Sequence, residues 1–117
     1  MNNKIKVGDI FCDDNGVASF YQVVQIYNSG RVRIREIEKN ETPTECGDTF
    51  KATPIPNKFK PKEEYKKIDN YVRIKDNDKG TIKLIQQFDD GNFFISFYTG
   101  YACIYIGKAV NSTYYYW

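Results

Sequence analysis

Three arginines at alternate positions are the residues whose spacing points most directly to binding chemistry. Arg31, Arg33 and Arg35 have one aliphatic residue between each pair, and alternate residues of a β-strand project from the same face about 6 to 7 Å apart. Side chains at that separation can contact successive phosphates of a nucleic acid. The competing interpretation is a solvated strand face whose charge is neutralised by Glu36, Glu38 and carboxylates of a neighbouring strand.

Other basic and aromatic side chains could extend such a surface. The lysines of a later hairpin, Lys75 and Lys83, are open to the same two interpretations. Exposed tyrosines beside cations can also stack unpaired bases, as in small barrels that bind single strands. In a small all-β domain, however, most aromatic side chains fill the core. The candidate residues for binding a nucleic acid or another partner are Arg31, Arg33, Arg35, Lys75, Lys83, Tyr98, Tyr101 and Tyr105.

Catalytic and cofactor chemistry has little support in the sequence. The chain contains no histidine, which removes Ser-His-Asp and Cys-His relays, histidine zinc sites and imidazole proton shuttles. Asp76–Gly80 resembles the start of an EF-hand loop, but Gln87 stands where the bidentate glutamate is required; we interpret this stretch and Asp89–Asn92 as polar turns. No glycine-rich stretch follows a strand and opens a helix as a phosphate cradle does. We therefore expect no enzymatic activity, no metal and no cofactor.

Length and composition predict one small folded domain. The 117 residues suffice for one core, 41% of them are hydrophobic, and the formal net charge is only +2. We expect a single β domain over residues 1–117 with a proline-rich connector at 54–61. The chain has three cysteines without C-x-x-C spacing, Cys12, Cys46 and Cys103. We interpret them as small hydrophobic residues that are buried. The sequence lacks a signal-like or membrane-spanning apolar stretch, so we expect a protein of a reducing cytoplasm that is not in the membrane.

Short runs of β-branched and aromatic residues between Gly, Asn and Asp predict strands that would position these side chains. The second predicted strand is apolar on both faces and should be central. Ile37 falls on the arginine side, which predicts a bulge near Glu36, while Ile82 and Leu84 alternate with polar neighbours and predict one apolar and one polar face. The predicted strands cover residues 7–12, 20–27, 31–38, 49–54, 71–75, 81–88, 93–98, 101–106 and 114–117.

The spacing of these strands predicts an all-β fold. We expect a small SH3-like or partly open β-barrel of about seven to eight strands. One short helix near residues 62–68 is compatible with this fold, because Pro61 suits the first helical position. Neither the strand order nor the oligomeric state follows from the sequence.

An ordered set of motifs resembles a known group of proteins. The motifs are Lys6–Phe11 (KVGDIF), Phe20–Val24 (FYQVV) and Gly107–Val110 (GKAV). Together they resemble small proteins that phages, plasmids and integrated elements of Gram-positive bacteria encode, a family without an established function. The Trp-Gly-Tyr loop typical of that family after the first strand is replaced here by Cys12–Val17.

The sequence thus favours a protein that acts by binding. The first hypothesis is a protein-interaction module, and the resemblance implies a host protein or defence machinery as its partner. The alternative is a small nucleic-acid-binding barrel that uses Arg31, Arg33 and Arg35 with neighbouring tyrosines.

Overall fold

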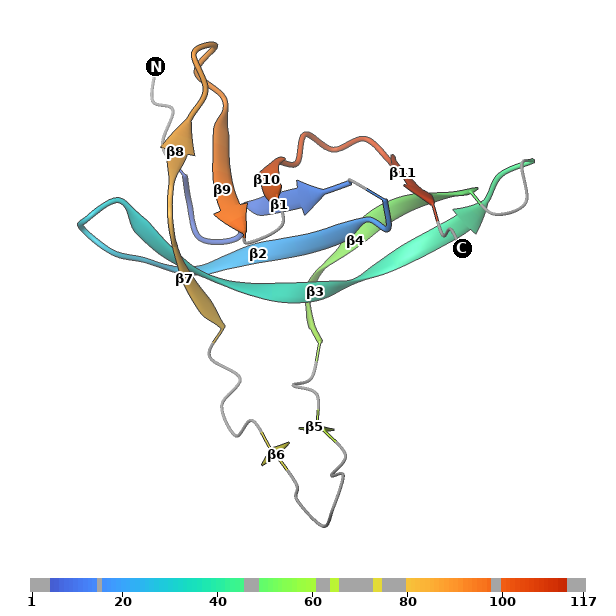
Figure 1. Ribbon diagram of the computed structural model, residues 1–117, viewed down its shortest axis with the longest axis horizontal. Helices are drawn as coiled ribbons and strands as arrows, with labels where there is room; N and C mark the ends of the chain where they lie inside the picture. Colours follow the sequence, from blue (N-terminus) through green and yellow to red (C-terminus); the bar gives the residue numbers. More distant parts are fainter. Residues whose placement is uncertain are drawn as a thin grey trace.

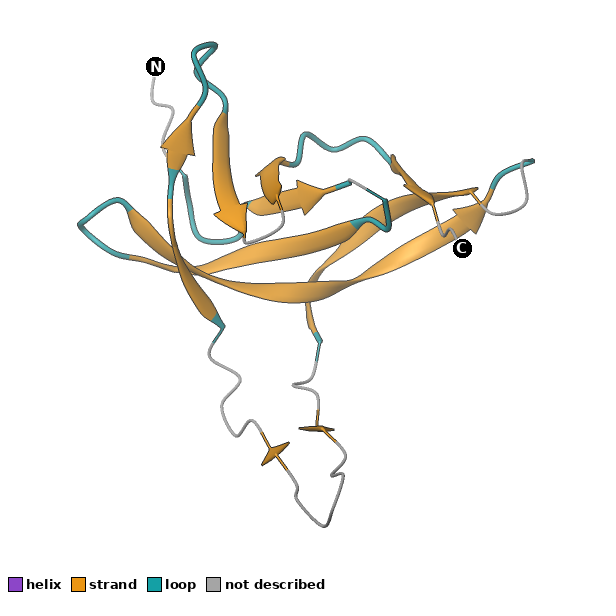
Figure 2. Ribbon diagram, viewed as in Figure 1, coloured by secondary structure: helices purple, strands orange, loops and turns teal. Residues whose placement is uncertain are grey.

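The computed structural model describes residues 5–14, 16–45, 49–60, 64–65, 73–74, 80–97 and 100–113. These residues form strands and connecting turns and contain no helix, as Figure 2 shows, which confirms the predicted all-β class. The strands are β1 Ile10–Asp13, β2 Ser19–Ile26, β3 Arg31–Pro43, β4 Thr49–Phe59, β5 Glu64–Tyr65, β6 Arg73–Ile74, β7 Thr81–Leu84, β8 Gln86–Gln87, β9 Phe93–Phe97, β10 Gly100–Ile104 and β11 Val110–Thr113.

Nine of the strands form one antiparallel sheet. Its order is β11-β4-β3-β2-β1-β10-β9-β8, and β7 pairs with β3 outside this path. Only Ile85 separates β7 from β8, and β8 pairs with β9, so one chain segment connects the two sides of the curled sheet (Figure 1). The sheet is compatible with a small open barrel, and its strands do not close it completely. β5 and β6 form a separate two-stranded sheet.

The long strand β3 has different neighbours along its two halves. Residues Arg31 to Ile34 pair with β7, whereas residues Ile37 to Pro43 pair with β4. Figure 1 shows β7 crossing β3 near one end and β4 following it toward the other. A strand of this length can join two curled parts of a sheet because each half receives its ladder hydrogen bonds from a different partner.

Two apolar clusters lie on opposite faces of the sheet. Phe11 belongs to the first cluster and Cys12 to the second, and consecutive strand residues point to opposite faces. The buried residues of the first are Phe11, Val23, Val32, Ile34, Ile95 and Ala102. Those of the second are Cys12, Ala18, Phe20, Ile37 and Ala52. Both faces of β1 and β2 are therefore covered, in agreement with the apolar pattern that predicted a central second strand.

A buried polar network holds β11 against the second cluster. Ser112, which is fully buried, accepts a hydrogen bond from the backbone N–H of Ala18 at 2.9 Å and donates one to Glu41 at 3.0 Å. Lys39 donates to the carbonyl of Ala18 and lies 3.5 Å from the carboxylate of Glu41. Because each buried polar group has a partner, this network can lie beside apolar side chains at little cost.

Irregular pairing explains where β3 departs from the expected pattern. Its register with β2 is continuous through Glu36, and the shifts occur between Val23 and Gln25 on β2 and between Ile37 and Lys39 in the pairing with β4. The irregularity expected near Glu36 thus occurs between Ile37 and Lys39, and only in the pairing with β4. Ile37 lies on the arginine side without a bulge because β4 and the second cluster cover that side from Ile37 onward.

The segment after β3 also differs from expectation. The predicted 49–54 strand continues through Pro54 to Phe59, and Asn57 takes a positive φ of 67° within the irregular stretch. Glu64–Tyr65 pairs with β6, so these two residues form a strand where a short helix near 62–68 was expected; the rest of that range lies outside the described residues. Pairing with a second strand satisfies backbone groups that one helical turn would leave open. The predicted 114–117 strand also lies outside them.

Gly80 and Gly91 provide a test of the junction between β7 and β3. Both have a positive φ, +95° and +91°, so alanine is strained at either position, at about 1–2 kcal/mol. An added Cβ at Gly80 would lie 2.1 Å from the carbonyl oxygen of Ile34, whereas one at Gly91 has no atom within 4 Å. We expect Gly80→Ala to lower the free energy of unfolding clearly more than Gly91→Ala in urea titrations. Equal losses would contradict this β7–β3 contact.

Candidate nucleic-acid or protein interface on β3 and β7

An aliphatic side chain accompanies each of the first two arginines. In the ladder between β3 and β7, Arg31 faces Leu84 and Arg33 faces Ile82, and residues that face each other across a ladder share one side of the sheet. Ile82 and Leu84 are each 45% exposed. We call the surface formed by Tyr27, Arg31, Arg33, Ile82 and Leu84 the basic–aliphatic face.

Aromatic side chains hold two of the three arginines in place. Arg33 donates from Nε and Nη2 to the hydroxyl oxygen of Tyr27, at 3.1 and 2.8 Å. The guanidinium carbon of Arg35 lies 4.2 Å from the ring centroid of Phe59, which is cation–π geometry. Arg31 is exposed at the end of the hairpin. Arg33 and Arg35 are thus presented from fixed positions, and Arg31 is the most accessible of the three to a partner.

The interpretation of a neutralised strand face requires carboxylates beside the arginines. Glu36 follows Arg35 on the opposite side of β3, and its carboxylate pairs with Lys60 at 3.0 Å. The segments 17–35 and 80–88, which build β2, the start of β3, β7 and β8, contain no Asp or Glu at all. The segments that build the basic–aliphatic face therefore supply no carboxylate to offset the charges of Arg31 and Arg33.

The exposed aliphatic pair is the part of this surface that sequence reasoning missed. The alternation of Ile82 and Leu84 with Thr81 and Lys83 was identified, but not which side would face solvent. Lys83 lies opposite Val32 and places its amine 4.5 Å from the ring centroid of Phe97, on the side of the first cluster. The predicted candidate Lys83 is therefore not beside the arginines. Lys75 and Tyr98 lie outside the described residues.

Tyr101 and Tyr105 line a cleft of about 470 Å³. This cleft lies on a different part of the sheet's outer surface from the arginines. Tyr101 is 54% exposed and packs edge-on against Phe88 at 5.5 Å, and Tyr105 packs edge-on against Phe20 at the same distance. Asp14 and Asp90 also line this cleft. Carboxylates beside the tyrosines disfavour a phosphate backbone there.

Gln22 and Asn57 lie between the arginines and this cleft. Gln22 faces Arg35 on one side and Ile10 on the other, and its side chain exchanges two 2.8 Å hydrogen bonds with Asn57, one of them from the Asn57 backbone. Gln22 is only 4% exposed. The structure thus brings Arg31, Arg33 and Arg35 together but separates them from Tyr101 and Tyr105.

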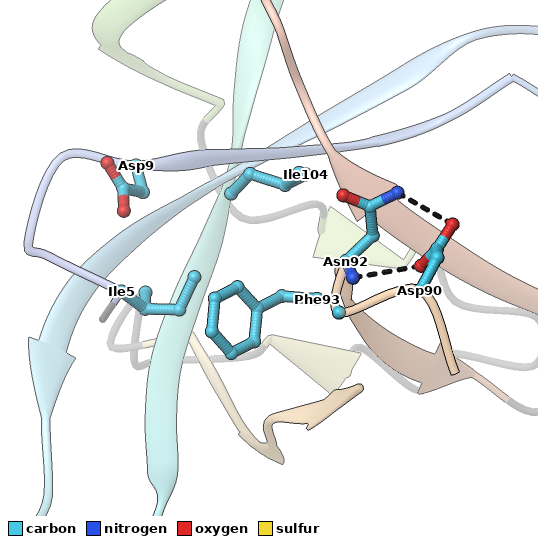
Figure 3. A pocket seen from close by; sticks show the side chains of 7 residues that line it. Ile5, Asp9, Asp90, Asn92, Phe93 and Ile104 are labelled. Carbon is cyan, nitrogen blue, oxygen red and sulfur yellow. Dashed lines mark hydrogen bonds between the residues drawn. The ribbon is translucent and has the colours of Figure 1, made fainter. Parts of the chain in front are cut away.

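A second, smaller cleft of about 340 Å³ carries two carboxylates, and Figure 3 shows apolar side chains between them. Asp90 accepts 3.0 Å hydrogen bonds from the backbone and side-chain nitrogens of Asn92 (Figure 3), and Asp9 accepts one from the backbone of Lys6 at 2.8 Å. Both carboxylates thus hold turns, as predicted for Asp89–Asn92.

Two thiols face each other in the larger cleft. Cys12 on β1 is the ladder partner of Cys103 on β10, and both are free cysteines. Burial raises the pKa of Cys12 to about 12, with further contributions from the carboxylates of Asp14 and Asp13. Burial also raises the pKa of Cys103, again with Asp14 contributing. Among the described residues, no group of three or more acidic or cysteine side chains is arranged to hold a metal ion.

Comparison with models of protein families, with curated proteins and with solved structures finds no match to this chain. The resemblance to mobile-element proteins therefore remains a prediction from the motifs. In the part of the chain that the structure describes, there is no helix with the length and apolar character needed to cross a membrane.

The raised pKa of Cys12 predicts a pH dependence of stability. Between 9.0 and about 12 the folded protein keeps this thiol protonated, whereas the unfolded chain has lost the proton. Unfolding then releases a proton, so the contribution of Cys12 to stability is complete below pH 9 and declines as the pH rises through this window. We expect the difference in unfolding free energy between the wild type and Cys12→Ala to shrink from about pH 8 to about pH 11. A difference that stays constant over this interval in urea titrations would contradict the shift.

Proposed function

We propose that the protein is a non-catalytic binding module whose basic–aliphatic face binds an acidic, partly apolar segment of another protein. The observation that carries this proposal is the register of β3 with β7, which places exposed Leu84 beside Arg31 and exposed Ile82 beside Arg33. A partner that carries both carboxylates and aliphatic side chains can bind the arginines and the exposed aliphatic side chains at the same time. The arginine forks can bind carboxylates through paired hydrogen bonds.

The exposed aliphatic row favours a protein over a nucleic acid. Burying a Leu or Ile side chain contributes about 1.5–3 kcal/mol when the partner is apolar, whereas a phosphate backbone offers such side chains little. A single-strand-binding surface gains affinity from aromatic stacking beside cations. Tyr101 lies with Asp14 and Asp90 at the separate cleft, and Tyr27, the one tyrosine of the basic–aliphatic face, is already engaged by Arg33. The basic–aliphatic face therefore has the composition expected for an acidic protein segment.

Nucleic acid is the second candidate, and one observation favours it. The strands that build this surface carry Arg31, Arg33 and Arg35 without a single acidic residue in segments 17–35 and 80–88. A row of arginines attracts any polyanion. The two candidates therefore differ in whether the aliphatic side chains contribute to binding.

The proposal includes the biological setting that the motifs suggest. The resemblance of Lys6–Phe11 and Phe20–Val24 to proteins of mobile elements supports a phage or plasmid origin, with a host or defence protein of the bacterial cytoplasm as the partner. An acidic segment on such a protein is the chemistry that the basic–aliphatic face would recognise.

Variants that shorten the aliphatic side chains and the arginine separately distinguish a protein partner from a nucleic acid. We expect a fluorescent peptide of alternating Leu and Glu to bind the protein, and Ile82→Ala/Leu84→Ala and Arg31→Ala each to weaken binding about tenfold or more, because each removes over about 1.4 kcal/mol of contact. Fluorescence anisotropy measures both effects. The matched control is Ile106→Ala, which truncates an aliphatic side chain that is 75% exposed and lines the other cleft, and it should leave affinity unchanged.

A labelled DNA oligonucleotide is the second probe in this experiment. Binding of the oligonucleotide that declines steeply with salt, is lost in Arg31→Ala and is unaffected by Ile82→Ala/Leu84→Ala would support the nucleic-acid candidate. The same pattern for the peptide would show attraction of polyanions alone and contradict the proposed protein-binding function.

A further inference from the structure

The two thiols of the larger cleft lie opposite each other on neighbouring strands. Cys12 and Cys103 are ladder partners and so project from the same side of the sheet. The backbone N–H of Tyr105 donates to the carbonyl of Ile10 at 2.7 Å, which makes Ile10 and Tyr105 a hydrogen-bonded pair. Because hydrogen-bonded and non-hydrogen-bonded pairs alternate along an antiparallel ladder, Cys12 and Cys103 also form a hydrogen-bonded pair.

This position allows the two sulfur atoms to be joined. The Cα atoms of a hydrogen-bonded pair are about 5.5 Å apart, and disulfides span Cα separations of about 4.4–6.8 Å. The Cβ atoms of such a pair must move together by about 1 Å to reach the spacing of a disulfide. The bond is therefore reachable from the folded state and strained once formed, and strained disulfides are the ones that are easily reduced.

We infer that Cys12 and Cys103 form a reversible oxidative modification site that a hydroperoxide converts into a cross-strand disulfide. The site is independent of the proposed binding function, because neither thiol belongs to the basic–aliphatic face.

The chemistry has two balanced steps. In the first, the thiolate of Cys103 attacks one oxygen of hydrogen peroxide, the O–O bond breaks, and the thiol proton and the released hydroxide leave as water, which gives a sulfenic acid. In the second, Cys12 attacks the sulfenic sulfur, the S–S bond forms and the S–O bond breaks, and the second water leaves. Two sulfurs are oxidised, two peroxide oxygens are reduced, and each thiol loses one hydrogen.

Burial assigns the order of the two steps. Cys103 is partly exposed and Cys12 is 9% exposed, and both line the cleft of about 470 Å³, which a small peroxide can enter. Cys103 is therefore the thiol that meets the oxidant and Cys12 the one that resolves the sulfenic acid. The charged side chains that face the two thiols or line this cleft are Asp13, Asp14, Asp90, Lys39 and Lys108.

The local charges predict how the reaction depends on pH. The reacting species is the thiolate, and burial together with the carboxylate of Asp14 raises the pKa of both cysteines. Oxidation is therefore slow at neutral pH and accelerates as the pH rises. Removing the charge in Asp14→Asn lowers both pKa values and should accelerate oxidation at a fixed pH.

The experiment uses the full chain in a Cys46→Ser background, so that only the two facing thiols remain. We expect treatment of the folded protein with hydrogen peroxide to remove two hydrogen atoms from the intact mass, and a non-reducing digest to yield one linked peptide pair joining Cys12 to Cys103. Dithiothreitol should restore the original mass. Asp14→Asn should shorten the half-time of this change without altering the product.

A matched variant controls for disulfides formed in the unfolded chain. Cys103→Ser/Ile104→Cys keeps the number of thiols but moves one to the opposite side of β10, and circular dichroism verifies that it remains folded. We expect it to form no intramolecular disulfide under the same treatment. Formation of the bond at the same rate in this variant overturns the inference. So does peroxide treatment of the original background that leaves both thiols reduced or carries Cys103 alone to the sulfinic acid.

Discussion

The pairing of β3 with two different strands is the constraint on which the other features depend. Its arginine side is open to solvent while β7 is the neighbour, and the same side becomes buried at Ile37, which is 1% exposed, where β4 takes over. A strand cannot move its side chains to the other face without a register change. One uninterrupted alternation therefore provides cations for the surface along its first half and part of the second apolar cluster along its second half.

This arrangement also determines how the cations are presented. Tyr27, which directly follows β2, and Phe59, the last residue of β4, approach Arg33 and Arg35. They reach these positions because both strands pair with β3. Side chains that are already ordered lose less conformational entropy when a partner binds. The aliphatic neighbours from β7 then add apolar area to a surface that would otherwise attract anions without selectivity.

The Gln22–Asn57 contact divides the outer side of the sheet into two chemically different regions. On one side lie the arginines with their aliphatic neighbours, and on the other lies the cleft with tyrosines, carboxylates and the two thiols. Burial and Asp14 keep Cys12 and Cys103 protonated near neutral pH. The cleft thus has an environment that suppresses thiol reactivity, whereas the basic–aliphatic face favours encounters with anions.

Local sequence determined the elements of this protein, because alternation and turn chemistry act over a few residues. The pattern of Phe20–Tyr27 and Phe93–Tyr98 placed β2 and β9 within a residue or so, and the spacing of Arg31, Arg33 and Arg35 correctly placed them on one side of a strand. The tertiary structure decided which side Ile82 and Leu84 show to solvent, which residue faces Cys12, and that Tyr101 and Tyr105 lie apart from the arginines. A period of two is the same for either face of a strand, so only the register with strands distant in the sequence selects which face is buried and which residues meet.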